Sequence, residues 1–347
     1  MWITSSLKTA KTPTNVALGN FDGVHLGHQR VMAQILDTQE SLPQIMSAQS
    51  VDALHRGAIA SGHSYLSGSA QLGANDQDEF TRQGRSTVVT FLPHPQEYFS
   101  GVSRPLLTPI AEKIWLLSQM GIQQLVMLPF NQALAELSPE DFVKQVLIDG
   151  LQPQRISVGS DFRFAKSRSG NALALEKLAA QYHVPVTRVE LKQEKGDRIS
   201  SSRIRQALQA GELLEATQLL GRPYVLTGKV VLGEQIGRTI GFPTANLRVP
   251  EDKYLPRTGV YVVRVYGNSL SSQRGLMNIG HRPTVGGQSL SVEIHLLDWS
   301  GDLYGQLLTV SLEKFVRPEQ KFDSLAQLKQ QIEQDCETAR QSIFISS

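Results

Sequence analysis

The stretch from Asn15 to Leu36 constrains this chain most, because it predicts a strand, a tight turn and a helix in direct succession. Residues 15–18 have the composition of a short buried strand, and residues 29–36 repeat apolar side chains at helical spacing. Between them, residues 19–28 read Gly-Asn-Phe-Asp-Gly-Val-His-Leu-Gly-His. A strand that leads through a glycine-rich turn into a helix is typical of parallel α/β sheets, which bind ligands at the carboxyl ends of their strands.

Two histidines stand at the predicted start of this helix. His25 and His28 are three residues apart, so both imidazoles are expected on one face. Unpaired backbone N–H groups and the positive end of the helix dipole attract an anion to the same place, and Gly27 leaves room for a polyphosphate to approach the backbone. The alternative is a helix start with two solvated histidines; the strand, the turn and Gly27 together favour phosphate binding.

The His-Leu-Gly-His arrangement, with its preceding Gly-Asn-Phe-Asp turn, resembles the nucleotidylyltransferase superfamily. The resemblance implies an enzyme that aligns a nucleophilic phosphate with the α-phosphorus of a nucleoside triphosphate and stabilises the charge that develops as pyrophosphate leaves.

Further along, strand and helix patterns alternate up to about residue 189, which predicts a parallel sheet with helices on both faces. Residues 1–14 read as a polar lead-in. Residues 41–86 are rich in Gln, Ser, Gly, Ala and Asp, and we expect a mobile surface insertion there. At Ser201, Ser202 and Arg205, hydroxyls and a guanidinium enter another predicted helix; alone they indicate only a well-capped helix, but beside the histidines they predict the second half of a triphosphate site.

Beyond residue 221 the pattern changes to short strands separated by turns, which predicts a small antiparallel β-barrel. We therefore expect two domains, 1–221 and 222–347, of which the first is Rossmann-like. A closing helix begins at Ser324, with Gln327 completing a capping box. Its predicted buried stripe is Leu325, Leu328, Ile332, Cys336 and Ala339.

Several polar groups of this second half have chemical potential. The glycine-rich segment 233–241 holds Gly237 and Arg238 and has the composition of a phosphate-binding loop. Thr244 and Asn246 offer the hard oxygen ligands that Mg²⁺ accepts. Strand alternation places Glu293 and His295 on one face, where the carboxylate is able to act as a base. Taken singly, on composition alone, these segments favour the ordinary interpretations: a glycine turn, a polar loop and an exposed strand pair.

Their order along the chain resembles the riboflavin kinases. The segments that carry this resemblance are 237–246, 278–284, 292–298, 302–305 and 315–319. The opening turn resembles the FMN adenylyltransferase module, as do residues 90–95, 158–164 and 199–205. Together they resemble the prokaryotic bifunctional riboflavin kinase/FMN adenylyltransferase (FAD synthetase) family over nearly the whole chain.

The resemblance implies a role for each matching residue. His25 and His28 would contact ATP in adenylyl transfer, and Glu293 would activate the ribityl hydroxyl of riboflavin for phosphorylation. Thr244 and Asn246 would bind Mg²⁺ and nucleotide. The other implied ATP contacts are Gly19, Asn20, Phe21, Asp22, Gly27, Ser201, Ser202, Arg205, Gly237 and Arg238. Asp161, Phe162 and Arg317 would contact flavin.

Three residues depart from the family pattern. Ala165 stands where glycine is common, Ser202 replaces the commoner threonine, and Leu92 replaces an often polar residue. Two rival interpretations follow: a riboflavin kinase whose adenylyltransferase is weakened, and a flavin carrier that binds without turnover.

The composition limits the other classes of function. A net charge of +2 without basic runs argues against a nucleic-acid partner, and the longest apolar stretches are too short to cross a membrane. The single Cys336 excludes an internal disulfide framework. We expect a cytoplasmic enzyme, either a monomer or a weak homo-oligomer, whose partners are riboflavin, FMN and ATP.

Overall fold

The computed structural model describes residues 1–36, 84–190, 193–194, 197–233, 237, 240–268, 270–284 and 287–342. This part of the chain forms two compact units. The first contains residues 1–36, 84–104 and 110–200, and the second contains Pro105–Pro109 and residues 201–342. The domain boundary at 221 and 222 stays a prediction. Residues 41–83 of the expected insertion lie outside the described residues.

The first unit is built on a six-stranded parallel sheet, as the alternating pattern predicts. Its strands, in order across the sheet, are β1 (Trp2–Thr4), β4 (Gln124–Pro129), β3 (Arg85–Leu92), β2 (Thr14–Leu18), β5 (Pro153–Gly159) and β8 (Val186–Val189). All five residues of β2 are buried, as expected of a strand that is covered on both faces. The strand order reverses between β2 and β5, where sheets of this kind bind ligands.

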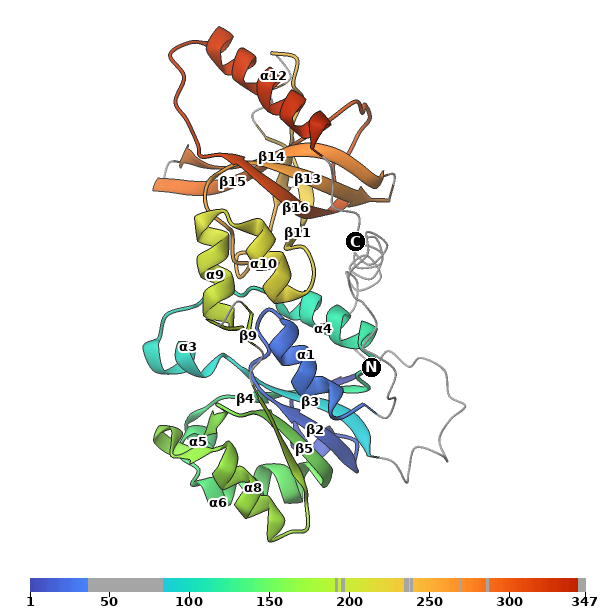
Figure 1. Ribbon diagram of the computed structural model, residues 1–347, viewed down its shortest axis with the longest axis vertical. Coiled ribbons are helices and arrows are strands. Elements are labelled where there is room, and N and C mark those ends of the chain that lie inside the picture. Colours follow the sequence, from blue (N-terminus) through green and yellow to red (C-terminus); the bar gives the residue numbers. More distant parts are fainter. Residues whose placement is uncertain are drawn as a thin grey trace. The chain divides into compact units, whose positions relative to one another are not determined.

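Helices cover both faces of this sheet (Figure 1). The helices of the unit are η1 (Leu7–Thr9), α1 (Leu26–Ala33), α3 (Pro95–Ser100), α4 (Ile110–Gln119), α5 (Gln132–Ala135), α6 (Pro139–Asp141), the π-helix η2 (Phe142–Ile148), α7 (Asp149–Leu151), η3 (Lys166–Arg168) and α8 (Ala172–Ala180). Two short hairpins join β6 (Arg163–Phe164) to β7 (Gly170–Asn171) and β9 (Gln193–Glu194) to β10 (Asp197–Arg198).

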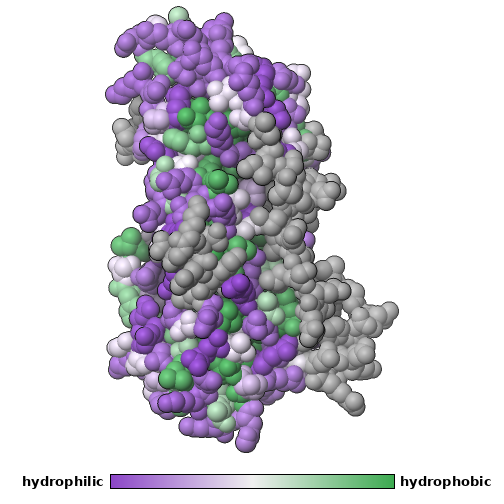
Figure 2. Space-filling model, viewed as in Figure 1, coloured by the Kyte–Doolittle hydropathy of each residue, from purple (hydrophilic) through white to green (hydrophobic). Residues whose placement is uncertain are grey.

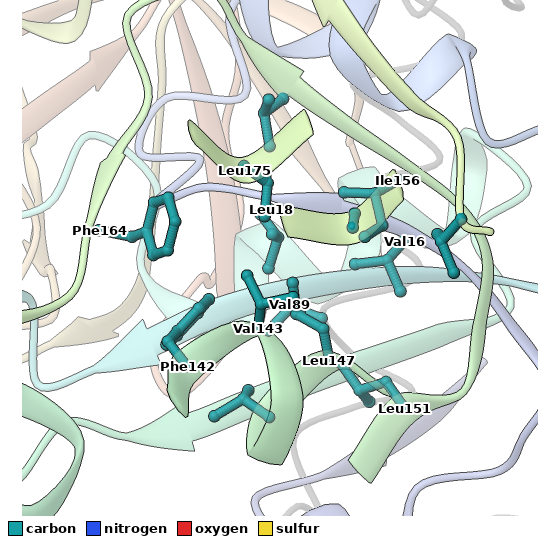
Figure 3. Packing of buried hydrophobic residues seen from close by; sticks show 14 of the residues in the cluster. Val16, Leu18, Val89, Phe142, Val143, Leu147, Leu151, Ile156, Phe164 and Leu175 are labelled. Atoms are coloured by element: carbon teal, nitrogen blue, oxygen red, sulfur yellow. The ribbon is translucent and has the colours of Figure 1, made fainter. Parts of the chain in front are cut away.

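One hydrophobic core fixes the position of β2 and therefore of the turn that follows it. Figure 3 shows Val16 and Leu18 of β2 packed with Phe142 and Leu147 of η2 and with Leu175 of α8. Each of these side chains is at most 2% exposed. Burial of such a cluster stabilises the folded chain by about 25 cal/mol for each Å² of apolar surface removed from water.

The structure corrects two expectations at strand ends. The first residues are no mere polar lead-in, because Trp2–Thr4 forms β1 and pairs with β4. Arg85 and Ser86, expected in the insertion, belong to β3. A three-residue strand is too short to show a periodic pattern, and the polar residues at the start of β3 conceal its extended run.

The second unit contains the predicted antiparallel barrel, which is closed and six-stranded. Around the barrel the strands are β11 (Val225–Val231), β12 (Ala245–Arg248), β15 (Gly287–Leu296), β14 (Leu270–Thr284), β13 (Gly259–Gly267) and β16 (Leu307–Arg317). Two helices, α9 (Ser201–Ala210) and α10 (Leu213–Leu220), belong to the same unit. The barrel is the expected one, except that β12 arises where the sequence indicated a polar loop.

The closing helix, α12 (Leu325–Gln341), packs on the outside of the barrel. Cys336 and Ala339 are buried against Val260, Val262 and Leu276. The cysteine is therefore a packing residue. The predicted stripe is wrong at its first position, because the side chain of Leu325 is 63% exposed in the first turn of the helix. Among the described helices, none combines the length and the apolar run that a membrane span requires.

Candidate active sites

The turn between β2 and α1 places two imidazoles side by side. The helix begins at Leu26, so His25 is its N-cap residue, and His25 Nδ1 accepts a hydrogen bond from the His28 backbone N–H at 3.2 Å. The two rings stack with centroids 3.5 Å apart and planes 16° from parallel. The prediction that both histidines share one face is confirmed.

The cap bond also sets the chemistry of His25. Because Nδ1 accepts a hydrogen bond, the neutral ring carries its proton on Nε2 and presents an N–H donor there. Gly27 gives this ring its place, since a Cβ at Gly27 would lie 3.2 Å from His25 Nδ1 and Cε1. An N–H donor at the start of a helix is suited to a phosphate oxygen.

Two residues other than glycine have left-handed backbone conformations in this turn. Phe21 has φ of 49° and Val24 has φ of 43°, an unusual value for a β-branched side chain. Both side chains are almost fully buried. The Asn20 carbonyl accepts hydrogen bonds from Thr90 Oγ1 at 3.1 Å and from Lys113 Nζ at 2.9 Å.

Lys113 was missed as a member of this neighbourhood, and His94 was quoted in the motif 90–95 but assigned no role. Lys113 lies in α4 and is only 7% exposed; burial lowers its pKa, and the negative charge of Asp22 opposes the shift. His94 caps α3. Burial lowers the pKa of His94, the positive charge of Arg104 lowers it further, and the negative charge of Asp22 opposes the shift. The one available signal for Lys113 was a lysine among apolar residues of a predicted buried helix.

An exposed aromatic cluster, also missed, lies where β3 and β4 end. Tyr98 and Phe99 of α3 contact the ring of Phe130, which follows β4, with centroids 5.3 and 5.8 Å apart, and Phe91 of β3 contacts Phe130 at 5.9 Å. Phe99 is 70% exposed. Figure 2 shows apolar surface at the position of α3. Such a surface is suited to a flat aromatic ligand.

The predicted flavin contacts of the first unit follow β5. Asp161 forms an ion pair with Arg198 of β10, and both side chains are substantially exposed. Phe162 is half-buried against the core and stacks on Phe164 with centroids 5.8 Å apart. Their role in flavin binding stays a prediction.

The predicted second phosphate clamp lies at the start of α9, in the second unit. Ser201 is the first residue of α9. Arg205 Nη2 donates to the Pro105 carbonyl at 2.8 Å, and its guanidinium lies over the Tyr254 ring. Arg203 pairs with Glu215 of α10. That Ser201, Ser202 and Arg205 join the histidines at one triphosphate stays a prediction.

On the barrel, three strands bring the predicted kinase residues together. Thr244 Oγ1 donates to Glu293 Oε2 at 3.2 Å. Asn246 of β12 is the cross-strand partner of Glu293 in β15, and Asn278 of β14 is its partner on the other side. In-register neighbours point to the same face of a sheet, so Asn246, Glu293 and Asn278 form one polar row. Asn278 was quoted in a motif but assigned no role.

His295 supports the loop that carries Thr244. As predicted by alternation, it lies on the same face as Glu293. His295 Nδ1 lies 2.9 Å from the Pro243 carbonyl oxygen, and its ring meets Phe242 edge-on at 5.4 Å. Gly233 makes room for the neighbouring amide, because a Cβ there would lie 2.0 Å from Asn246 Nδ2.

The remaining predicted residues of this unit differ in their surroundings. Gly237 accepts the Phe242 N–H through its carbonyl at 2.8 Å, and a Cβ at Gly237 would lie 2.3 Å from the Phe242 oxygen. Arg238 lies outside the described residues. Arg317, at the end of β16, is bound by the buried Asp335 of α12 through Nη2–Oδ2 at 2.8 Å and Nε–Oδ2 at 3.0 Å. Its predicted flavin contact remains to be tested.

The oxygen atoms around Glu293 fit a hard cation. Among the described residues, no group of three His, Cys, Asp or Glu side chains is arranged to hold a metal. Thr244, Asn246 and Glu293 instead present a hydroxyl, an amide and a carboxylate to one another. Mg²⁺ binds through one or two such protein oxygens together with substrate phosphates and water.

Comparisons with known proteins match a different enzyme family to each half of the chain. The family described as riboflavin kinase matches residues 220–343, and the family described as FAD synthetase matches residues 7–48 and 54–203. The chain is 36% identical over 329 residues to the bifunctional riboflavin kinase/FMN adenylyltransferase of Escherichia coli K12, covering 94% of this chain and 91% of that protein. It is 33% identical over 339 residues to the Bacillus subtilis protein of the same name, covering 96% and 93%.

A solved structure supports the fold over the full length. The crystal structure described as a macrolide-efflux protein from Streptococcus pneumoniae has a TM-score of 0.78 and 27% identity, covering 98% of this chain and 99% of that one. The activity in its name is that protein's own description.

Proposed function

The chain belongs to the family of bifunctional riboflavin kinases/FMN adenylyltransferases, and we propose that its two reactions use the two polar sites described above. The C-terminal unit phosphorylates riboflavin to FMN, and the N-terminal unit adenylylates FMN to FAD. The observation that carries the site assignment is the presence of two chemically different constellations, a stacked histidine pair and a carboxylate–hydroxyl–amide row, in the two units.

In adenylyl transfer, the phosphate of FMN attacks the α-phosphorus of ATP, and pyrophosphate leaves. His25 Nε2–H and His28 act as donors to the phosphate oxygens on which negative charge grows, and the start of α1 adds backbone N–H groups. Gly19, Asn20, Phe21, Asp22 and Gly27 shape this pocket, and Ser201, Ser202 and Arg205 hold the rest of the triphosphate. The acceleration comes from alignment and electrostatic stabilisation rather than from covalent catalysis.

The flavin ring of FMN is placed on the exposed cluster of Tyr98, Phe99 and Phe130. Three features support this placement. Tyr98 and Phe99 are exposed, both contact Phe130 edge-to-face, and the cluster lies at the carboxyl ends of β3 and β4. Asp161 and Phe162 contribute polar and apolar contacts from the end of β5.

In the kinase reaction, the ribityl 5′-hydroxyl of riboflavin attacks the γ-phosphorus of ATP, and ADP leaves. Glu293 accepts the hydroxyl proton as general base. Thr244 donates to the Glu293 carboxylate and so orients it. Gly237 and Arg238 are assigned to the nucleotide phosphates and Arg317 to flavin.

Thr244 and Asn246 are the residues that would hold Mg²⁺, together with oxygens of ATP. When bound, the cation neutralises charge on the phosphates of the nucleotide. We further propose that the enzyme is cytoplasmic, acts as a monomer or weak homo-oligomer, and has no nucleic-acid partner.

The test separates the two sites in the full-length chain. Riboflavin, ATP and Mg²⁺ are supplied, and riboflavin, FMN and FAD are resolved by chromatography over time; a parallel reaction begins from FMN. Glu293→Ala is expected to abolish FMN formation while FMN is still converted to FAD. His28→Ala is expected to do the reverse, so that FMN accumulates.

Loss of both activities in either folded variant would contradict the two-site assignment. Accumulation of FMN by the unaltered chain would restrict the activity to the kinase unit. Flavin binding with no turnover, and unaffected by Glu293→Gln, would indicate a carrier.

A further inference from the structure

A lysine lies buried behind the turn that carries the histidine pair. Lys113 projects from α4 and is 7% exposed, although lysine is almost never buried without a partner. Its ammonium group donates to the Asn20 carbonyl at 2.9 Å. None of the family motifs recognised in the sequence includes this lysine, and the reaction steps above leave it without a role.

The turn needs external support because part of its backbone is strained. Left-handed conformations at Phe21 and Val24 cost free energy, and they persist only where the surroundings determine them. Side chains hold the carbonyl that precedes this segment and the carbonyl at its end: Thr90 and Lys113 donate to Asn20 O, and Gln29 Nε2 donates to Val24 O at 3.0 Å. Lys113 is the one cation among these donors.

The buried ammonium group of Lys113 also has an opposite charge to interact with in the turn. Asp22, within the turn and 6% exposed, is the charge that acts on Lys113 and partly offsets the cost of burying the ammonium group. Lys113 and Asp22 both act on His94, at the start of α3. Lys113 therefore contacts the turn through the Asn20 carbonyl, Asp22 lies within the turn, and His25 and His28 follow at its end.

We propose that Lys113 is a positioning residue for adenylyl transfer, which fixes the Asn20–Val24 turn through the Asn20 carbonyl and so aligns His25 and His28 with the phosphate. This inference rests on the proposed assignment of adenylyl transfer to the histidine pair. Lys113 itself touches neither substrate nor the reacting atoms in this scheme.

A positioning role predicts a particular kinetic change. Displacement of the histidines by a fraction of an ångström weakens contacts that matter most in the transition state, so kcat falls more than the KM for ATP rises. Misplacement on the scale of 1 Å costs about 100-fold, and we expect a loss of about 10- to 100-fold in kcat.

The test replaces Lys113 with methionine, which keeps the length of the side chain and removes the charge and the donor. In full-length Lys113→Met, kcat and KM are measured for FMN-to-FAD conversion, and riboflavin phosphorylation by the same molecules reports on the other unit. Leu117→Ala is the matched control, because Leu117 is fully buried one turn further along α4. It is expected to lower the melting temperature with little change in kcat per folded molecule.

Thr90→Val removes the other donor to the Asn20 carbonyl and keeps the shape of the side chain. Thr90→Val keeps the inference testable if Lys113→Met does not fold. We expect it to lower kcat for FAD formation, by less than Lys113→Met does. The inference is overturned if kcat for FAD formation is unchanged in the folded variant tested, or if Leu117→Ala lowers kcat equally. His28→Ala distinguishes the site assignment from the positioning role. If His28→Ala retains FAD formation, the assignment of the site is wrong. If His28→Ala loses FAD formation while Lys113→Met is unaffected, only the positioning role is overturned.

Discussion

Replacing Ala165 with glycine should stabilise the N-terminal unit, against the usual effect of this substitution. Ala165 has φ of 65° and ψ of −178°, a region of backbone conformation that is almost restricted to glycine. The conformation is held in place because Ala165 O accepts the Arg168 N–H at 3.0 Å, while the next residue, Lys166, donates its N–H to the Leu137 carbonyl at 2.9 Å. The family resemblance also places glycine at this position.

The expected magnitude is a difference of two terms. An alanine in this region carries about 1–3 kcal/mol of strain, and glycine gives back about 0.5–1 kcal/mol through the greater freedom of the unfolded chain. The difference is about 0–2.5 kcal/mol, so the free energy of unfolding should rise by about 1 kcal/mol at the middle of that range. For a unit of this size that corresponds to a rise of about 2–4 °C in the melting temperature of the N-terminal transition, and of at most about 10 °C.

Calorimetry of the full-length chain measures this transition, with loss of FMN-to-FAD conversion on heating identifying the unit. Ala174→Gly in α8 is the control, where glycine should lower stability by about 1 kcal/mol because the residue is helical. An Ala165→Gly variant that is destabilised as much as Ala174→Gly would refute the strain argument.

Two further variants test contacts in the barrel unit. Asp335→Ala leaves the Arg317 guanidinium, which is 14% exposed, without its carboxylate and should lower the free energy of unfolding by about 3–5 kcal/mol. Faster hydrogen exchange in α12 and a lower melting temperature would report this loss. The double variant with Arg317→Met should recover much of it, and additive losses would contradict a coupled pair. Gly233→Ala should displace the Asn246 amide and lower riboflavin kinase activity by about 10- to 100-fold, while FMN-to-FAD conversion is retained. Kinetics with riboflavin and with FMN as substrate measure the two activities. An unchanged kinase rate would show that Asn246 is not part of the site.

Local sequence determined the parts of the structure that depend on neighbours along the chain. The strand–turn–helix unit was predicted from its apolar runs and the glycines between them, and the shared face of His25 and His28 from their spacing of three positions. The barrel was predicted from short strand-like segments separated by turns. The family resemblance assigned Thr244 and Glu293 to one reaction, but their contact across 49 residues was not predicted and is a finding of the structure.

The missed features all depend on contacts between distant segments. β1 and β12 have three and four residues, too few for a periodic pattern. Lys113 resembles any helical lysine until the fold places the Asn20 carbonyl before it, and the rings of Tyr98 and Phe130 meet only because α3 packs beside the end of β4. Tertiary position decides the role of such residues.

The shortness of β1 has a consequence for aggregation. In the six-stranded sheet the open edges are β1 and β8, of three and four residues, so few unpaired backbone groups are available to a strand of another molecule. β1 pairs with Gln124, Leu125 and Val126; if it were lost, the whole of β4, with the sequence Gln-Leu-Val-Met-Leu-Pro, would be an unpaired edge. Apolar edge segments of this length promote intermolecular pairing. β1 therefore covers half of an apolar strand that would otherwise lie open along its length to a strand of another molecule.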